Sequence, residues 1–337
     1  MSSVDYGRIL RRSWELTWNN KWLWVVGMVL AAFGGGGGNT GTGGGSGTSS
    51  SNLREIPANL PGQLPEKAEE VLGMATSAVG EWFVSVPVLT WVLLGAGVVL
   101  LVVLVTAISM VARSWAKGAL VGGMDLADSG KEASLKTMTG FGFSNIKSLI
   151  IFSVISGAVV LGVVAGYGVV FGVGMLVFGW FETLRTVWLV LTVTVGVLAL
   201  VLLMLINAMI GMYAERLIVL KGMAPWEAWK RGLALSRGNF LPTLLMGLLN
   251  NAVGCSAGCL SMMVLLVIFG VPAVIVALPI ISSGFSGSGW ISVGGLVALF
   301  ILFLNANVML RGIVIVFSYG NWNLFFKQIA DKTEVKQ

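Results

Sequence analysis

The sequence predicts an all-α fold: a polytopic membrane bundle of six transmembrane helices in three repeats of an elbow helix and a hairpin. Composition supports this, because 56% of the residues are hydrophobic and 11% are charged, against about 25% charged residues in soluble domains. Of the 21 Lys and Arg residues, all but three lie at the chain ends and in the loops on one side of the predicted crossings. The three exceptions are Arg54, Lys67 and Arg185. Such an excess in short loops marks the cytoplasmic face. We therefore expect a protein of the inner (plasma) membrane with both termini in the cytoplasm.

The crossings follow from the lengths of the apolar segments. A helix needs about 20 apolar residues to cross the bilayer. The candidate crossings are residues 22–33, 87–111, 148–179, 187–212, 240–281 and 291–317. The first is short even when it is extended backward through Leu16 and Trp18, and a cleaved secretory signal peptide is its alternative interpretation. The third is longer than a crossing requires, so we expect it to tilt, bend or protrude.

Residues 240–281 leave two alternatives open. The segment could form one crossing, or it could form a hairpin that turns near residues 254–258. The hairpin would move the four basic residues that follow it to the outer side. The single crossing fits the charge bias better.

An internal repeat is visible before the odd-numbered crossings. Three stretches that each end in Asn precede them, at residues 6–20, 135–145 and 226–239. A basic residue stands nine positions before each final Asn, and these residues are Arg11, Lys136 and Lys230. The predicted repeat units are residues 1–111, 128–212 and 224–317.

The three stretches are predicted to be elbow helices that lie in the membrane surface. In the first, Tyr6, Leu10, Trp14 and Trp18 recur every four residues and so share one helix face. A helix with aromatic residues on one face and basic residues on the other lies at the bilayer surface. Plain cytoplasmic extensions of the crossings are the alternative. The predicted lipid contacts are Arg11, Trp14, Lys136, Trp226, Trp229 and Lys230.

The whole chain, residues 1–337, is expected to form a single integral membrane domain. Its first outer loop contains a flexible Gly-rich linker, residues 34–52, which lacks the ending of a phosphate-binding P-loop. An acidic helix over residues 64–83 and a charged C-terminal tail over residues 318–337 are also predicted.

Five Asn side chains are the most polar groups inside the apolar segments. They are Asn207, Asn250, Asn251, Asn305 and Asn307. All five fall in the inner half of the predicted bilayer, where amides need hydrogen-bond partners. They could meet in one polar pocket reached from the cytoplasmic leaflet, or they could serve helix packing alone.

Catalytic chemistry is not visible in the sequence. The chain has no His, which removes the commonest general base and a common metal ligand. Cys255 and Cys259 share a helix face but have no further soft ligands, so we interpret them as packing residues, like the glycine pair Gly162 and Gly166. No Asp, Glu, Lys or Arg lies in the middle of a predicted crossing, which argues against a proton-driven pump. We therefore expect neither an enzyme nor a bound cofactor or metal.

The elbow-then-span unit also carries a family resemblance. With Trp226-Glu-Ala-Trp-Lys-Arg-Gly-Leu before Asn239, and with the Gly-rich first outer loop, it resembles the glycerophosphoryl diester phosphodiesterase membrane-domain family and related uncharacterised prokaryotic membrane proteins. The resemblance covers most of the chain and implies a membrane-embedded fold. The His and acidic metal ligands of that family's phosphodiesterase domain are absent here, so the resemblance implies no activity.

The expected function is that of a membrane scaffold that interacts with lipid or organises partner proteins. The expected partners are anionic headgroups on the cytoplasmic side, which account for the net charge of +6 without nucleic acid. A homo-oligomer or a membrane-protein partner is left open. The alternative is a permease-like subunit that moves a small or lipidic solute through the Asn-lined pocket.

Overall fold

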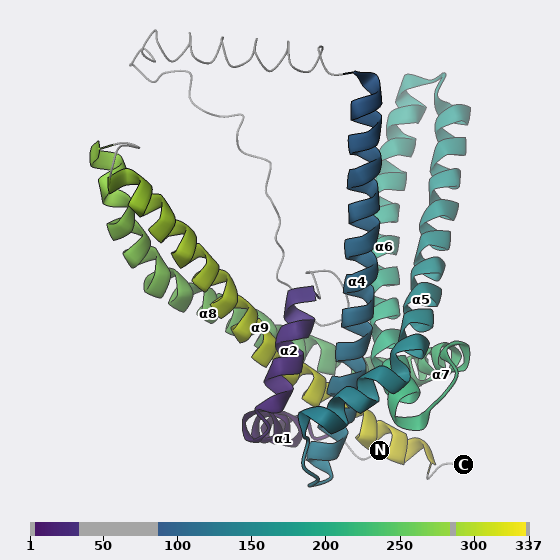
Figure 1. Cartoon of the computed structure of the whole chain (residues 1–337). Helices are drawn as coiled ribbons and strands as arrows, with labels where there is room; N and C mark the ends of the chain where they lie inside the picture. The colour runs from purple at the N-terminus through teal and green to yellow at the C-terminus, as the bar shows by residue number, and fades with distance from the viewer. Residues whose placement is uncertain (1–3, 34–86, 284–287, 335–337) are drawn as a thin grey trace. The chain divides into compact units, whose positions relative to one another are not determined.

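The all-α prediction is confirmed. The computed structural model describes residues 4–33, 87–283 and 288–334, and it places eight helices and no strand in those ranges (Figure 1). The helices are α1 (Tyr6–Asn19), α2 (Trp22–Phe33), α4 (Val88–Asp128), α5 (Leu135–Phe178), α6 (Glu182–Lys221), α7 (Pro225–Gly238), α8 (Phe240–Ser283) and α9 (Ser288–Glu334). The Gly-rich linker and the predicted acidic helix lie outside the described residues.

The chain divides into two compact units. Residues 45–109 form the smaller unit, whose described part is residues 87–109, with exposed apolar side chains on α4. Residues 1–44 and 110–337 form the larger unit. All the contacts described below lie within the larger unit.

Five helices, α4, α5, α6, α8 and α9, are long and apolar enough to cross a membrane. They have 40 to 47 residues, which at 1.5 Å per residue is about 60–70 Å. The hydrocarbon core of a bilayer is only about 30 Å thick. The prediction of a multi-pass helical membrane protein is therefore supported. All of these helices except α8 continue well beyond the crossings that we predicted for them.

The first predicted crossing differs from the other five. The chain breaks at Asn20, so Leu16 and Trp18 belong to α1 and do not lengthen the next helix. Helix α2 has 12 residues, which is about 18 Å at 1.5 Å per residue. The described part of the chain thus contains five long apolar helices and one short one.

Residues 240–281 form a single helix. Helix α8 runs without interruption from Phe240 to Ser283, so the hairpin alternative near residues 254–258 is wrong. A turn inside hydrocarbon would leave backbone N–H and C=O groups without partners, whereas a continuous helix satisfies them.

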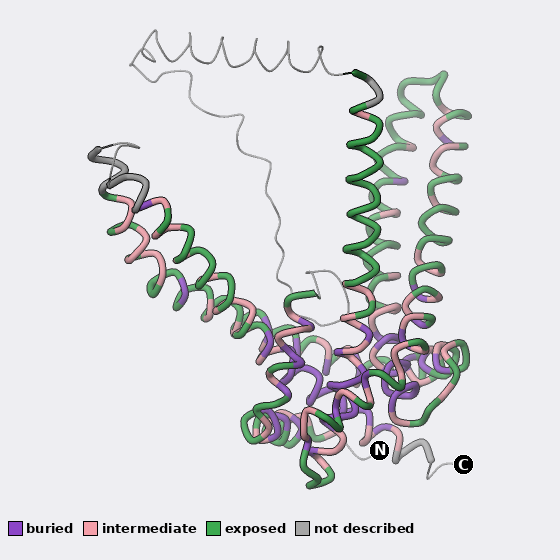
Figure 2. Tube along the Cα trace, in the orientation of Figure 1, coloured by how far each residue is buried: buried purple, intermediate pink, exposed green. Residues whose placement is uncertain are grey.

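Buried side chains gather at one end of the long helices, and we call this cluster the basal core (Figure 2). It is built from Ile9 and Leu16 of α1, Leu23 and Val26 of α2, residues 116–127 of α4, residues 138–152 of α5, residues 213–219 of α6, Ala228 of α7, Met246 of α8 and residues 315–329 of α9. Farther along the same helices, apolar side chains such as Leu176, Leu198 and Val267 are exposed. A helix that is apolar all round belongs in a membrane, so lipid is the medium that suits this surface.

The C-terminal segment contributes to the basal core. Residues 318–334, for which we predicted a charged tail, form the last turns of α9. Tyr319, Trp322 and Phe325 are at most 5% exposed there. The polar residues between them had hidden an i, i+3, i+4 apolar pattern, which marks a buried helix face.

Two of the three predicted elbows are separate helices. Helices α1 and α7 are followed by the capping residues Asn20 and Asn239. The second predicted elbow, residues 135–145, is the first part of α5 without a break, although the α5 ribbon changes direction along its first turns (Figure 1).

The final Asn makes the same contact in all three elbow stretches. Its side-chain amide donates to the backbone carbonyl four residues earlier, at 3.1 Å for Asn20, 3.1 Å for Asn145 and 3.2 Å for Asn239. In α1 and α7 this bond accompanies the end of the helix, whereas Asn145 lies inside α5. The sequence repeat therefore has a local structural counterpart.

Each elbow stretch packs closely on one long helix. Ser13 of α1 lies against Gly320 of α9, and Gly142 of α5 lies against Trp115 of α4. In the third contact a Cβ on Gly232 of α7 would lie 3.0 Å from a backbone carbonyl of α6. Small residues let helix backbones approach closely, and here they fix the elbows to the basal core.

Candidate functional site

One short segment of α9, residues 317–323, connects four other helices, and we call it the α9 hub. It exchanges hydrogen bonds with Ser13 of α1, Val121 of α4, Glu215 of α6 and Asn250 of α8. The donor–acceptor distances are 2.9, 2.9, 3.5 and 2.7 Å in that order. Buried polar groups need such partners, so the hub determines where the surrounding helices can sit.

Beside the hub lies an ionic cluster made of Lys117 of α4, Glu215 and Arg216 of α6, and Tyr319 of α9. Lys117 Nζ is 2.6 Å from one carboxylate oxygen of Glu215, as in a charge-assisted hydrogen bond. The Tyr319 hydroxyl donates to the other oxygen at 3.5 Å. Glu215 is 3% exposed. Because both of its oxygens are engaged, Glu215 connects three long helices and does not present a free base.

Arg216 is the most deeply buried charge of the cluster, at 1% exposure. Its Nη1 donates to the carbonyl of Met212 at 2.6 Å. Its guanidinium lies 5.6 Å from the centre of the Tyr319 ring, a favourable cation–π distance. Its Nε and Nη2 atoms have no hydrogen-bond partner among the described residues. The cluster thus holds two cations around one carboxylate.

The sequence pattern alone does not predict this cluster. In the sequence, Arg216 is only one of the basic residues that mark the predicted cytoplasmic face. A signal was available, because Glu215 and Arg216 interrupt an apolar run that resumes at Leu217. A charged pair flanked on both sides by apolar residues is more often buried and paired than exposed in a loop.

The five Asn residues of the predicted pocket fall into separate environments. Asn207 accepts a hydrogen bond from Ser156 of α5 at 2.6 Å. Asn250 accepts from Asn321 of the α9 hub at 3.3 Å, in addition to its bond to Ser318. Both contacts link neighbouring helices, which is the role expected of amides in helix packing.

The remaining three residues of that set lie elsewhere. Asn305 is exposed and donates to the carbonyl of Ile301 on its own helix at 2.7 Å. Asn251 is exposed and Asn307 is half-buried. Within the described residues no hydrogen bond joins two of the five. The permease-like hypothesis stays a prediction.

The predicted lipid contacts on α1 form an aromatic and basic surface. Trp14 and Trp18 are 55% and 43% exposed, and their rings pack edge to face with centroids 5.4 Å apart. Trp18 in turn packs against Trp24 of α2 at 5.0 Å. The Arg11 side chain is 86% exposed. Helix α1 therefore presents both kinds of side chain that a bilayer surface binds.

The other two elbows repeat this composition in part. On α7, Lys230 lies 5.2 Å from the ring of Trp226, which is 48% exposed and stacks on Trp229. Trp229 itself packs against the basal core, so it is less available to lipid than we predicted. Lys136 is exposed at the start of α5.

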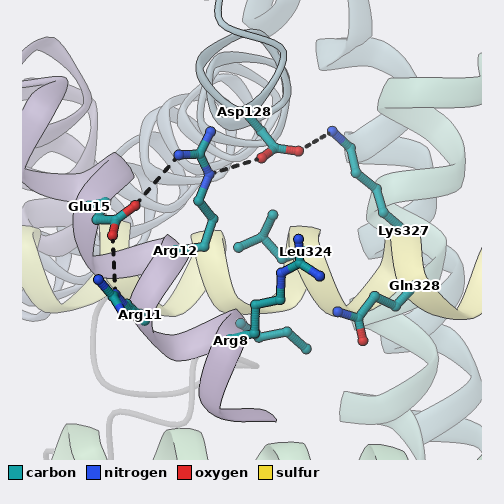
Figure 3. Close-up of a pocket in the computed structure, with 9 residues that line it drawn as sticks. Arg8, Arg11, Arg12, Glu15, Asp128, Leu324, Lys327 and Gln328 are labelled. Carbon is teal, nitrogen blue, oxygen red and sulfur yellow. Dashed lines mark hydrogen bonds and ion pairs between the residues drawn. The ribbon is translucent and has the colours of Figure 1, made fainter. Parts of the chain in front are cut away.

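A cleft of about 460 Å³ opens between α1, the end of α4 and α9 (Figure 3). It is lined by Arg8, Ile9, Arg11, Arg12, Glu15, Asp128, Leu324, Lys327 and Gln328. Arg12 lies between Glu15 and Asp128, at 3.6 and 3.5 Å. Lys327 is 2.8 Å from Asp128. None of the five predicted pocket Asn residues lines this cleft.

No protein-family model, no curated protein and no solved structure matches this chain.

Proposed function

We propose that this chain is a six-span scaffold protein of the plasma membrane that binds lipid at the cytoplasmic leaflet and has no catalytic activity of its own. One observation carries the proposal. Exposed Trp and basic side chains occur together on α1 and α7. These two helices lie at the end of the long helices that contains the basal core, where the exposed apolar surface of the long helices ends. Both termini would then lie in the cytoplasm, as the charge bias predicts.

The faces of α1 suit the membrane surface. Ile9, Ser13 and Leu16 are buried against the basal core, whereas Trp14 and Trp18 share an exposed face. Basic residues occupy a third face. A helix that buries one side in protein, places Trp at headgroup level and directs cations to the water phase has the composition of an interfacial helix.

The packing order supports a three-repeat architecture. The elbow α1 packs on α9, the elbow at the start of α5 packs on α4, and the elbow α7 packs on α6. The second membrane-crossing helix of each unit, which is α4, α6 or α9, is its returning helix. Each elbow thus contacts the returning helix of the unit before it, and the elbow of the first unit contacts the returning helix of the third. Three equivalent units in a ring would produce this order. We propose that the ring presents three elbows to one leaflet.

Spin labelling tests the placement of the elbows. In a variant with Cys255 and Cys259 replaced by Ser, a nitroxide is attached at Trp14→Cys in the full chain reconstituted into vesicles. We expect it to be relaxed more by oxygen, which partitions into lipid, than by a water-soluble nickel complex. Leu176→Cys and Lys131→Cys are the lipid and water references, because both positions are exposed, one on an apolar helix and one in a turn.

A label at position 14 that behaves like the one at position 131 would place α1 in water and overturn the proposal. Hydrolysis of a phosphodiester by the purified chain would also contradict it, since that activity belongs to an enzyme.

A further inference from the structure

We propose that the cleft between α1, the end of α4 and α9 is a binding site for a phosphate group, and that Arg8 is its principal ligand-binding residue. The cleft volume of about 460 Å³ lies within the range of small-molecule sites, about 300–1,000 Å³. Four cationic side chains and two carboxylates line it, so its lining carries a net positive charge.

Lys327 does not account for that charge, because its ammonium is already occupied. It lies 2.8 Å from Asp125 and 2.8 Å from Asp128, the distance of charge-assisted hydrogen bonds. These two contacts hold the end of α4 against α9 and form one wall of the cleft. An incoming anion would have to displace two carboxylates to bind Lys327.

Arg12 is held much less tightly. Its guanidinium is 3.6 Å from Glu15 and 3.5 Å from Asp128, well beyond the roughly 2.7–2.9 Å of a charge-assisted hydrogen bond. A phosphate oxygen at the shorter distance could bind Arg12 without breaking a strong contact.

Arg8 has no ion pair with any acidic side chain in the described residues. Its backbone N–H donates to Asp5, at 2.9 Å, but its guanidinium extends toward the middle of the cleft, beside Leu324 (Figure 3). Because Arg8 and Arg12 are four residues apart, their side chains share one face of α1. Two planar guanidinium groups on one face can each donate two parallel hydrogen bonds to the oxygens of a phosphate group.

A lipid headgroup and a free phosphate ester share this chemistry. The lipid source rests on the proposed function, which places α1 and its exposed Trp14 and Trp18 at the leaflet surface. Basic pockets between membrane helices on the cytoplasmic side bind anionic headgroups in this way. The site itself depends only on the geometry of the cleft.

The test compares three variants of the full chain purified in detergent. Arg8→Gln removes the central cation, and Gln328→Glu adds a carboxylate to the cleft without changing α1. Lys131→Gln is the matched control, because it removes one exposed charge that lies outside both the cleft and the elbows. Bound phosphatidylglycerol is counted by native mass spectrometry against phosphatidylcholine, and thermal stability is measured with inorganic phosphate and with glycerol 3-phosphate.

We expect Arg8→Gln and Gln328→Glu each to weaken phosphatidylglycerol binding about tenfold, the effect of one charge-assisted contact, while Lys131→Gln binds like the unaltered chain. If only the soluble phosphates stabilise the chain, and Arg8→Gln abolishes that stabilisation, the site stands with a free phosphate ester as its ligand. An equal loss in Arg8→Gln and Lys131→Gln would overturn the cleft site, because binding would then follow the net charge of the chain and not the cleft. Binding unchanged in Arg8→Gln, or no binding at all, would also overturn the site, and the spin-label result would still decide the proposed function.

Discussion

At the scale of single residues, Glu215 has the most demanding environment in the basal core. It is buried and carries a charge, and its carboxylate depends on Lys117 for a counter-charge and on Tyr319 for a second donor. A buried ion pair contributes little net stability when intact, because both charges lose their hydration. Removing one partner is costly, because the other charge then stays buried without compensation.

Lys117→Met should therefore destabilise the chain strongly. We expect a loss of about 3 kcal/mol in the free energy of unfolding, the lower end of the range for a broken buried pair. Glu215→Leu alone should cost a similar amount. The double variant should be more stable than the sum of the two losses implies, as measured by chemical denaturation in detergent. Additive losses would mean that the two side chains do not interact.

At the scale of helices, glycine decides which pairs approach closely. A Cβ on Gly27 of α2 would lie 2.5 Å from the carbonyl oxygen of Gly312 of α9, so the two backbones nearly touch. By contrast, a Cβ on Gly162 or Gly166 of α5 would meet nothing within 4 Å. The close helix approach that we predicted for Gly162 and Gly166 is therefore not made within the part of the chain that the structure describes.

This contrast gives a matched pair of substitutions. Gly312→Val should lower the free energy of unfolding by about 1–3 kcal/mol, because the added methyl groups overpack the α2–α9 contact. Gly162→Val should change it by less than about 0.5 kcal/mol, as at an open surface site. Thermal unfolding of both variants in the same detergent makes the comparison. Equal effects would show that α2 does not dock on α9 at Gly312.

The last turns of α9 offer a second comparison within one helix. Phe325 has no exposed surface, so Phe325→Ala should cost about 3–5 kcal/mol, as for other buried aromatic residues. Leu304→Ala is the control, since Leu304 is 46% exposed on the same helix. Both variants are compared by chemical denaturation. If Phe325→Ala unfolds no more easily than Leu304→Ala, residues 318–334 do not belong to the core.

At the scale of the whole molecule, the orientation in the membrane follows from the basic residues. Lys131 lies in the exposed turn between α4 and α5, on the side that we predict to be cytoplasmic. Residues 46 and 286 lie in the two loops that we predict to be outside, and both fall beyond the described residues.

Cysteine labelling in intact cells tests this orientation. With Cys255 and Cys259 replaced by Ser, an impermeant maleimide should label Ser46→Cys and Ser286→Cys but should not label Lys131→Cys until the cells are opened. The positive-inside rule is the physical reason. Labelling of position 131 in intact cells, with protection of position 46 or 286, would reverse the topology and remove the basis of the repeat scheme.

Helix class and membrane character could be predicted from sequence because the bilayer imposes a simple rule. Apolar runs of sufficient length must form helices there, since no other open backbone arrangement satisfies its hydrogen bonds in hydrocarbon. The elbow pattern of Tyr6, Leu10, Trp14 and Trp18 was visible for a similar reason, because helix periodicity is local. The ends of the helices were less predictable. We predicted a charged tail where α9 continues, because polar residues lie between the apolar residues that form the buried face of residues 322–329.

The amino-acid sequence by itself determined the all-α class, the apolar helices and the excess of basic residues on one set of connections. Only the tertiary structure decided that Lys117 would meet Glu215, 98 positions away, and that Asn250 would bond to the α9 hub while Asn305 bonds to its own helix. Arg8 likewise became a candidate binding residue only when α1 was placed beside Asp128 and Lys327. Periodicity and hydropathy depend on neighbours along the chain, whereas the partner of a buried polar group depends on which distant helix packs against it.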